Sequence, residues 1–96
     1  MRGGIVMANI KLLPAALDKM RRSSKSYVVY IVRRGGWVGS HITPAVRAGK
    51  AEGNDDYSKT EIEGIDFYVR KDMLDKKYEI NWVGLWRIGQ FVIKEV

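Results

Sequence analysis

The chain has 96 residues, a net charge of +6 at pH 7 and no cysteine. This length fits one small domain, and a hydrophobic fraction of 46% with 10% aromatic residues is enough for a single core, which argues against a disordered chain. The lack of cysteine excludes disulfides, thiol nucleophiles and cysteine-ligated metal or iron–sulfur sites among these residues. It is in keeping with a cytoplasmic location.

The charge is unevenly distributed along the chain. Residues 1–50 carry ten Lys or Arg and one acid, a balance of +9, whereas residues 51–96 carry seven Lys or Arg and ten acids, a balance of −3. A basic half could favour nucleic acid or another polyanion. We prefer the simpler interpretation of solubilising charge, in which the two halves attract each other within the fold or across a dimer.

Neither a membrane span nor a secretory leader is expected. No apolar run approaches the roughly 20 residues that a membrane-spanning helix needs, and residues 1–6 lack the apolar stretch of a signal peptide. We expect residues 1–9 to form an N-terminal extension, with either Met1 or Met7 as the start, and residues 10–96 to form one domain.

The first elements along the chain are a short strand and a helix. Residues 10–12 can form the strand, and Pro14 suits the first turn of a helix because its missing N–H costs nothing there. Four apolar residues recur at helical spacing: Leu13, Ala16, Leu17 and Met20. The serine-rich residues 23–26 end this helix.

Residues 27–32 (YVVYIV) are the clearest strand, because they are β-branched or aromatic throughout. Both faces of this strand are expected to be largely covered. Residues 42–47 can be a second extended segment, which Pro44 limits to a sheet edge or an irregular strand. Residues 48–60 are polar and turn-rich, which predicts the longest loop.

The second half of the chain has further strand patterns. Residues 61–69 predict a hairpin with its turn at Glu63-Gly64, and residues 71–76 fit one helical turn or a loop. Two more strands are expected, at residues 78–83 and 90–94, with residues 84–89 as a glycine-bounded connection. The fold class is therefore α+β, a mostly β sandwich or pseudo-barrel of short strands with one N-terminal helix.

The stretch RRGGWVGSH, residues 33–41, combines three glycines, two arginines, a tryptophan and the single histidine. It is not a P-loop, because no Lys-Ser/Thr pair follows, and it lacks the βαβ context of a dinucleotide site. Gly36–Gly39 matches the loop of KH domains only superficially, because that loop joins two helices and this one leaves a strand. The glycines could expose N–H groups to an anion, with Arg33 and Arg34 adding charge. We prefer a tight turn.

Catalytic and metal-binding arrangements are hard to place. His41 has no partner at metal-ligand spacing, and Ser40 beside it lacks an acid and the elbow motif of a nucleophile. The acids of residues 52–56 could hold a hard cation but lack the spacing of a calcium loop, so a solvated loop is preferred. No acid–base pair is evident, so we expect no enzymatic activity, no metal site and no cofactor.

Aromatic residues beside arginines can stack on nucleic-acid bases. The candidates are Trp37, Trp82 and Trp86 with Tyr27, Tyr30, Tyr57, Tyr68 and Tyr78. We expect most of them to fill a core or a subunit interface instead, with Trp86 exposed in the turn before the last strand.

The order of these elements resembles the HesB-like domain of the A-type iron–sulfur carriers. The opening residues 10–17 are similar to the family's strand-then-helix start, and residues 62–69 (IEGIDFYV) are similar to its acidic-residue, glycine and alternating-apolar hairpin. Residues 80–83 and 89–93 resemble its closing strands. The resemblance implies the family's fold and a homo-oligomer.

The same resemblance implies a loss of cluster chemistry. The carriers place a cysteine between glycines in the turn after the long strand, and Trp37 occupies that position here; their C-terminal cysteine pair has no counterpart before Val96. Tryptophan cannot replace a thiolate ligand. We therefore expect a cysteine-free, non-catalytic binding or interaction module with an unknown ligand or protein partner and no membrane association. Its expected ligand-binding residues are Arg33, Arg34, Gly36, Trp37, Gly39 and His41. The alternatives are a basic nucleic-acid-binding module and metal binding through His41 and carboxylates.

Overall fold

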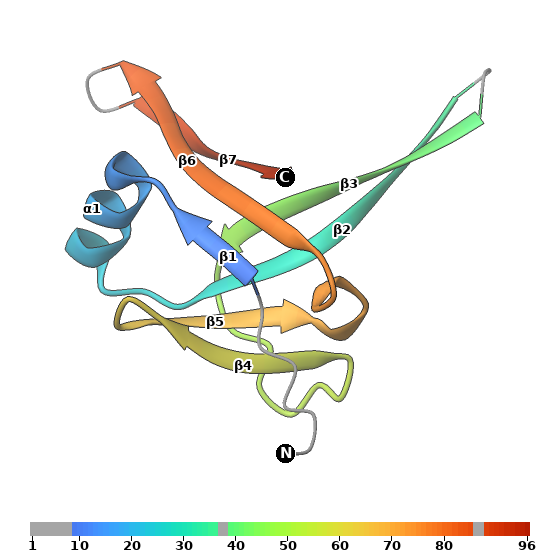
Figure 1. Ribbon diagram of the computed structural model, residues 1–96, viewed down its shortest axis with the longest axis horizontal. Coiled ribbons are helices and arrows are strands. Elements are labelled where there is room, and N and C mark those ends of the chain that lie inside the picture. Colours follow the sequence, from blue (N-terminus) through green and yellow to red (C-terminus); the bar gives the residue numbers. More distant parts are fainter. Residues whose placement is uncertain (1–8, 37–38, 86–87) are drawn as a thin grey trace.

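A computed structural model of the chain describes residues 9–36, 39–85 and 88–96. They form two β-sheets and one α-helix (Figure 1). The elements are β1 (Asn9–Leu12), α1 (Pro14–Ser23), β2 (Tyr27–Gly36), β3 (Gly39–Ala48), β4 (Tyr57–Ile62), β5 (Ile65–Arg70), the 3-10 helix η1 (Lys71–Met73), β6 (Lys77–Leu85) and β7 (Ile88–Glu95).

Both sheets are mixed. The three-stranded sheet has the order β1-β6-β7, with β1 parallel to β6, and the four-stranded sheet has the order β3-β2-β5-β4, with β2 parallel to β5. The remaining strand pairs are antiparallel hairpins. The predicted fold class, mostly strands with one N-terminal helix, is confirmed.

The helix α1 begins at Pro14, as predicted, after an extended Leu13. Ala16 and Met20 lie on its buried face. It ends where Ser24 adopts a left-handed conformation with φ of 52°, and the Ser23 hydroxyl lies 2.7 Å from the Tyr27 hydroxyl at the start of β2. No helix among the described residues is long and apolar enough to span a membrane.

The core lies between the two sheets, under α1. Its buried side chains come from both sheets, α1 and η1: Ala16, Met20, Tyr27, Val29, Ile65, Phe67, Val69, Met73, Tyr78 and Ile80. No charged side chain of the described residues is buried, so this core carries no penalty for the desolvation of a charge.

The hairpin at Glu63-Gly64 is confirmed. Glu63 and Gly64 have φ of 55° and 81°, both in the left-handed region, as the type I′ turn of a two-residue hairpin requires. Pro44 lies in β3, which is an edge strand, as predicted for a residue that lacks an N–H.

Two boundaries differ from the sequence-based expectation. Residues 84–89 were expected to form a connection, but Gly84-Leu85 end β6 and Ile88-Gly89 begin β7, with Gly84 paired to Gly89. The predicted loop at residues 48–60 is shorter, because β4 begins at Tyr57 and pairs with β5. Cross-strand pairing thus overrides the weak strand propensity of glycine and polar residues in both places.

Two long hairpins extend beyond the core (Figure 1). We call the first, β2 with β3, the basic ribbon, and the second, β6 with β7, the apolar ribbon. Their outer ends diverge in Figure 1, while their inner halves lie over the core. The ends of these ribbons carry the side chains from which a function can be argued.

Candidate functional site

The predicted ligand-binding residues lie at the outer end of the basic ribbon. Its register is continuous from Tyr27 with Ala48 to Gly36 with Gly39. Arg33, Gly39 and His41 are exposed, and the backbone of Arg34 pairs with that of His41. Trp37 lies outside the described residues.

The structure does not bring Arg33 and His41 together on one face. Arg33 pairs with Ile42, and successive residues of a strand alternate between faces, so His41 lies on the face opposite to Arg33. The neighbour of Arg33 is instead Ile42, an apolar side chain that is 59% exposed. One ligand cannot contact Arg33 and His41 from a single side of the ribbon.

The glycines at the outer end of the basic ribbon differ in what the backbone requires of them. Gly39 has φ of 119°, a conformation that side chains disfavour, and only two residues separate it from its partner Gly36. A Cβ on Gly35 would meet no atom within 4 Å. Residues 37–38, which would form the predicted tight turn, lie outside the described residues.

Polar side chains of the acidic loop between β3 and β4 take part in hydrogen bonds within the loop and to β5. Asn54 Oδ1 accepts a hydrogen bond of 2.9 Å from the Asp56 N–H, and the Tyr68 hydroxyl donates one of 3.2 Å to Glu52 Oε1. Burial raises the pKa of Tyr68, and the Glu52 carboxylate beside it adds to this effect. Within residues 9–36, 39–85 and 88–96, no three His, Cys, Asp or Glu side chains gather to hold a metal.

The described tyrosines mostly fill the core, as predicted. Tyr27, Tyr68 and Tyr78 are 2%, 3% and 5% exposed and cannot stack on a base. Tyr30 is half-buried, with the Arg47 guanidinium 5.7 Å from its ring centroid. Trp86, which was expected to be exposed, lies outside the described residues.

Trp82 fastens the apolar ribbon to the rest of the fold. The centroid of its ring lies 4.8 Å from that of Phe91 across the hairpin, and Lys19 Nζ of α1 lies 4.7 Å from the Trp82 centroid. The ring also passes directly over Gly89, where a Cβ would lie 2.6 Å from Trp82 Cζ2. Glycine at position 89 therefore provides the space that Trp82 fills.

The opposite face of the apolar ribbon is uncovered. Its exposed apolar side chains are Val83 at 53%, Leu85 at 74%, Ile88 at 83% and Val92 at 40%. Sequence reasoning missed this face because it treated residues 84–89 as a connection. The alternation of apolar residues on both sides of positions 86–87 was the available signal.

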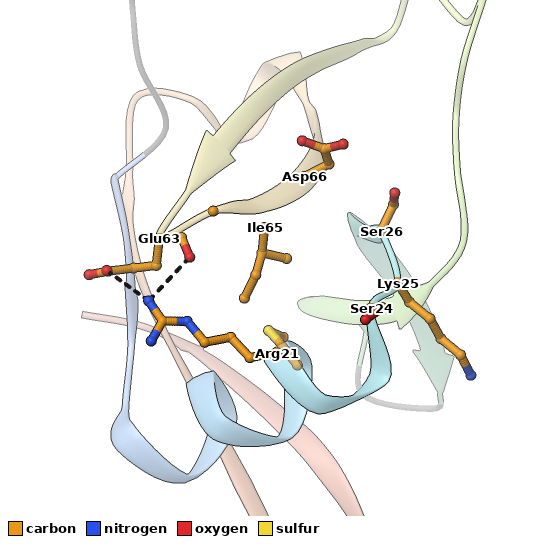
Figure 2. A pocket seen from close by; sticks show the side chains of 9 residues that line it. Arg21, Ser24, Lys25, Ser26, Glu63, Ile65 and Asp66 are labelled. Atoms are coloured by element: carbon orange, nitrogen blue, oxygen red, sulfur yellow. Dashed lines mark hydrogen bonds and ion pairs between the residues drawn. The ribbon is translucent and has the colours of Figure 1, made fainter.

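A shallow polar hollow lies between the end of α1 and the β4–β5 turn (Figure 2). Arg21 closes one side through an ion pair of 3.7 Å with Glu63 Oε1 and a hydrogen bond of 3.4 Å to the Glu63 carbonyl. Lys25 and Asp66 lie on the rim, and the apolar Ile65 forms part of the wall. Cations and carboxylates are balanced here, so the hollow has no strong preference for a charged ligand.

The fold defined by these two sheets is found in iron–sulfur proteins. Escherichia coli SufA, whose structure is described as involved in biosynthesis of iron–sulfur clusters, shares 14% sequence identity, with 91% of this chain and 85% of that chain covered and a TM-score of 0.64. IscA with a 2Fe–2S cluster shares 14% identity, with 90% and 81% covered and a TM-score of 0.55. The predicted HesB-like fold is confirmed. At this identity the likeness establishes the fold alone.

Residues 8–96 match the CC/Se motif containing family, and the chain belongs to that family. The 96 residues contain no cysteine, so a cysteine pair such as the family's name indicates is not among them. No curated protein sequence matches the chain.

Proposed function

We propose that the protein is a non-catalytic interaction module that binds a partner protein through the end of the basic ribbon. The contact residues are Arg33, Arg34, Gly36, Trp37, Gly39 and His41, together with Ile42. The observation that carries the proposal is the exposed pair of Arg33 and Ile42, paired across the ribbon beyond the core. A cytoplasmic location goes with this proposal.

The chemistry of this pair defines the partner's surface. A cation beside an exposed isoleucine favours a recess that is apolar on one side and acidic on the other. Because β2 and β3 are paired continuously to Gly36 and Gly39, the ribbon presents these side chains with little loss of conformational entropy on binding. Because His41 lies on the opposite face, a partner can contact both sides of the ribbon.

A non-catalytic role is supported by how the described polar side chains are used. Ser23 donates its hydroxyl hydrogen bond to the Met20 carbonyl at 3.0 Å and lies against the Tyr27 hydroxyl, so it is held in a helix-ending contact. The Glu52 carboxylate accepts from Tyr68 and pairs with Lys50 at 3.7 Å. Neither has the nucleophile–base arrangement that acyl or phosphoryl transfer requires.

The proposal is tested by partner capture with a matched control. The immobilised chain is compared with the double variant Arg33→Glu/Ile42→Asp and with Lys25→Glu, which makes the same Lys/Arg-to-Glu change on an exposed residue between α1 and β2. We expect a protein, identified by mass spectrometry, that the wild type and Lys25→Glu retain and the double variant loses. Circular dichroism checks that all three are folded.

Two results would contradict the proposal. The double variant could retain the same proteins as the wild type, which would remove the end of the basic ribbon as the contact surface. Alternatively, nuclease treatment could abolish retention, which would favour the nucleic-acid hypothesis. That hypothesis also predicts binding to a random oligonucleotide that weakens steeply with salt.

A further inference from the structure

The outer end of the apolar ribbon carries most of the exposed apolar side chains among the described residues. Four of the six large hydrophobic residues that are exposed in residues 9–36, 39–85 and 88–96 lie in this ribbon; the other two are Ile42 and Val96. We propose that this end inserts into the headgroup region of an anionic lipid bilayer and so docks the protein on a membrane surface. The site is separate from the partner-binding end of the basic ribbon.

The register gathers the apolar side chains on one face of the ribbon. Leu85 pairs directly with Ile88, and Val83 lies two residues before Leu85 on the same face. At about 3.3 Å per residue, Val83 and Leu85 are about 7 Å apart along the ribbon. Amphipathic helices that lie in a membrane interface are buried by about 5–10 Å. The apolar part of the ribbon end is therefore long enough to enter this layer and too short to cross it.

The ribbon end is a protrusion with one open face. It extends beyond the core in Figure 1. The other face is closed, because the Trp82 ring packs against Phe91 and lies over Gly89. A protruding apolar face buries its side chains in a fluid bilayer without a complementary shape, whereas burial against a protein requires a matching recess.

The charge near the ribbon end is compatible with an anionic surface. Residues 80–93 contain no acidic residue. The acids of β6 and β7 are Glu79 and Glu95, and each pairs with a lysine: Lys94 Nζ lies 3.6 Å from Glu79 Oε1, and Lys76 Nζ lies 3.7 Å from Glu95 Oε1. Neither strand therefore presents an unpaired carboxylate to lipid phosphates.

The rest of the chain is charged so that this end turns toward an anionic surface. Nine of the eleven acidic residues lie within residues 52–79, whereas residues 19–51 contain eight Lys or Arg and no acid. In Figure 1, β4 and β5 of the acidic segment lie at the bottom and the outer ends of both ribbons at the top. Lys19 Nζ, 4.7 Å from the Trp82 centroid, places a cation beside the apolar ribbon. An anionic leaflet attracts such cations.

The sequence-based expectation of no membrane association considered spanning helices and secretory leaders, and an inserted hairpin end needs neither. Attraction between the basic side of the protein and anionic lipid weakens as salt rises, whereas the apolar contribution does not. Because only a few side chains are buried, we expect reversible binding that needs both contributions.

Co-sedimentation with lipid vesicles tests the insertion. We expect the wild type to bind vesicles of equal parts phosphatidylcholine and phosphatidylglycerol, and to bind vesicles of phosphatidylcholine alone at least about tenfold more weakly. Leu85→Ser/Ile88→Ser should lower the partition coefficient on the anionic vesicles by about tenfold, because two apolar side chains no longer enter the bilayer. These residues are 74% and 83% exposed, so their replacement leaves the core intact, which circular dichroism checks.

The matched control is Ile42→Ser/Val96→Ser. It removes the two exposed large hydrophobic residues that lie outside the apolar ribbon, and it should bind the anionic vesicles like the wild type. Neither double variant changes the net charge, so both are attracted to the surface as strongly as the wild type is. A difference between them therefore reports on insertion.

The absence of cysteine allows a direct test of depth. An environment-sensitive dye is attached to Gln90→Cys, two residues from Ile88 on the same face of β7, or to Asp55→Cys in the exposed loop between β3 and β4. We expect anionic vesicles to shift the emission of the dye at position 90 to shorter wavelength, because it leaves water. The dye at position 55 should not respond.

Three results would overturn the proposal: a wild type that does not bind anionic vesicles at low salt, Leu85→Ser/Ile88→Ser binding as well as the wild type, or equal responses of the two dyes. A dye at position 90 that shifts with protein concentration alone, with no further response to vesicles, would show that another copy covers this face and would also overturn it. Partner capture contains no lipid and reports on Arg33 and Ile42, so failure here is distinguishable from failure of the proposed function.

Discussion

The two ribbons are built alike and end differently. Each is an antiparallel hairpin with two residues between its last described pair, Gly36 with Gly39 in one and Leu85 with Ile88 in the other. The basic ribbon ends in exposed Arg33 and His41, whereas the apolar ribbon ends in exposed leucine and isoleucine. One fold therefore presents two surfaces of opposite chemistry.

The ribbons also use glycine for different reasons. In the basic ribbon Gly39 supplies a left-handed backbone conformation, and Gly35 has free space around it. In the apolar ribbon Gly89 leaves room for an indole, and a Cβ on its partner Gly84 would overlap the Ile88 carbonyl. Gly35 therefore tolerates a side chain, whereas Gly39 is required by its backbone conformation and Gly84 and Gly89 are required by packing.

The largest expected difference between the ribbons is in how strongly each packs against the rest of the fold. Trp82→Ala removes a ring that contacts Phe91, Gly89 and Lys19, so it loosens β6, β7 and α1 together. Because the ring is half-buried, we expect the free energy of unfolding to fall by about 3 kcal/mol, the low end of the range for large aromatic truncations. Urea denaturation measures this change.

Tyr30→Ala is the matched change in the basic ribbon. Tyr30 is also half-buried and also lies under a cation, but Arg47 is farther away and belongs to the same hairpin. We expect a loss of about 1 kcal/mol. If the two variants lose equal stability, the apolar ribbon is not fastened to the core through Trp82.

A smaller difference in the free energy of unfolding is expected between two Gly→Ala variants, one in each ribbon. In Gly89→Ala the new Cβ would lie 2.6 Å from Trp82 Cζ2 and 2.8 Å from the Val83 carbonyl oxygen, so both ring and backbone must shift. We expect a loss of about 2 kcal/mol, typical of overpacking. Thermal and urea denaturation measure it, and tryptophan fluorescence should report a displaced indole.

Gly35→Ala is its control. No atom lies within 4 Å of the new Cβ, so the change should alter stability by less than about 1 kcal/mol, and a gain is expected from the reduced freedom of the unfolded chain. A Gly89→Ala variant as stable as Gly35→Ala would show that the apolar ribbon relaxes without cost, and the contrast drawn between the ribbons would fail.

Much of the fold could be predicted from local signals. Pro14 marked the start of α1, the β-branched run at residues 27–32 marked β2, and Glu63-Gly64 marked a turn that requires positive φ at both positions. Each of these depends on the residues themselves and their immediate neighbours, so no knowledge of the partner strand is needed.

The ends of the ribbons could not be predicted in the same way. Gly84 and Gly89 disfavour strands locally, and only their pairing across the hairpin, with Trp82 packed over the second glycine, holds them extended. Likewise, residues 33–41 looked like one cluster, but cross-strand register places Arg33 beside Ile42 and His41 on the other face. Proximity in sequence was a poor guide to which side chains share a face.

The smallest expected effect concerns alkaline pH at the inner end of the apolar ribbon. Tyr78 of β6 is buried and pairs with Glu95 of β7. Burial raises the pKa of Tyr78 above 10.0, and the carboxylates of Glu95, Asp75 and Asp72 act in the same direction because they repel a phenolate. The folded state therefore holds this proton more tightly than the unfolded state does.

This difference gives the pH dependence a definite sign. Well below pH 10 the tyrosine is protonated in both states and contributes no slope, whereas as the pH rises through 10 the unfolded chain releases the proton first, so stability falls. Tyr78→Phe has no proton to lose, and its free energy of unfolding should decline less than that of the wild type between pH 9 and pH 11. Urea denaturation across this range measures the difference. If the free energy of unfolding changes with pH in the same way for both proteins, Tyr78 ionises as easily in the folded chain as in the unfolded one. The inner end of the apolar ribbon would then be more open to water than its burial indicates.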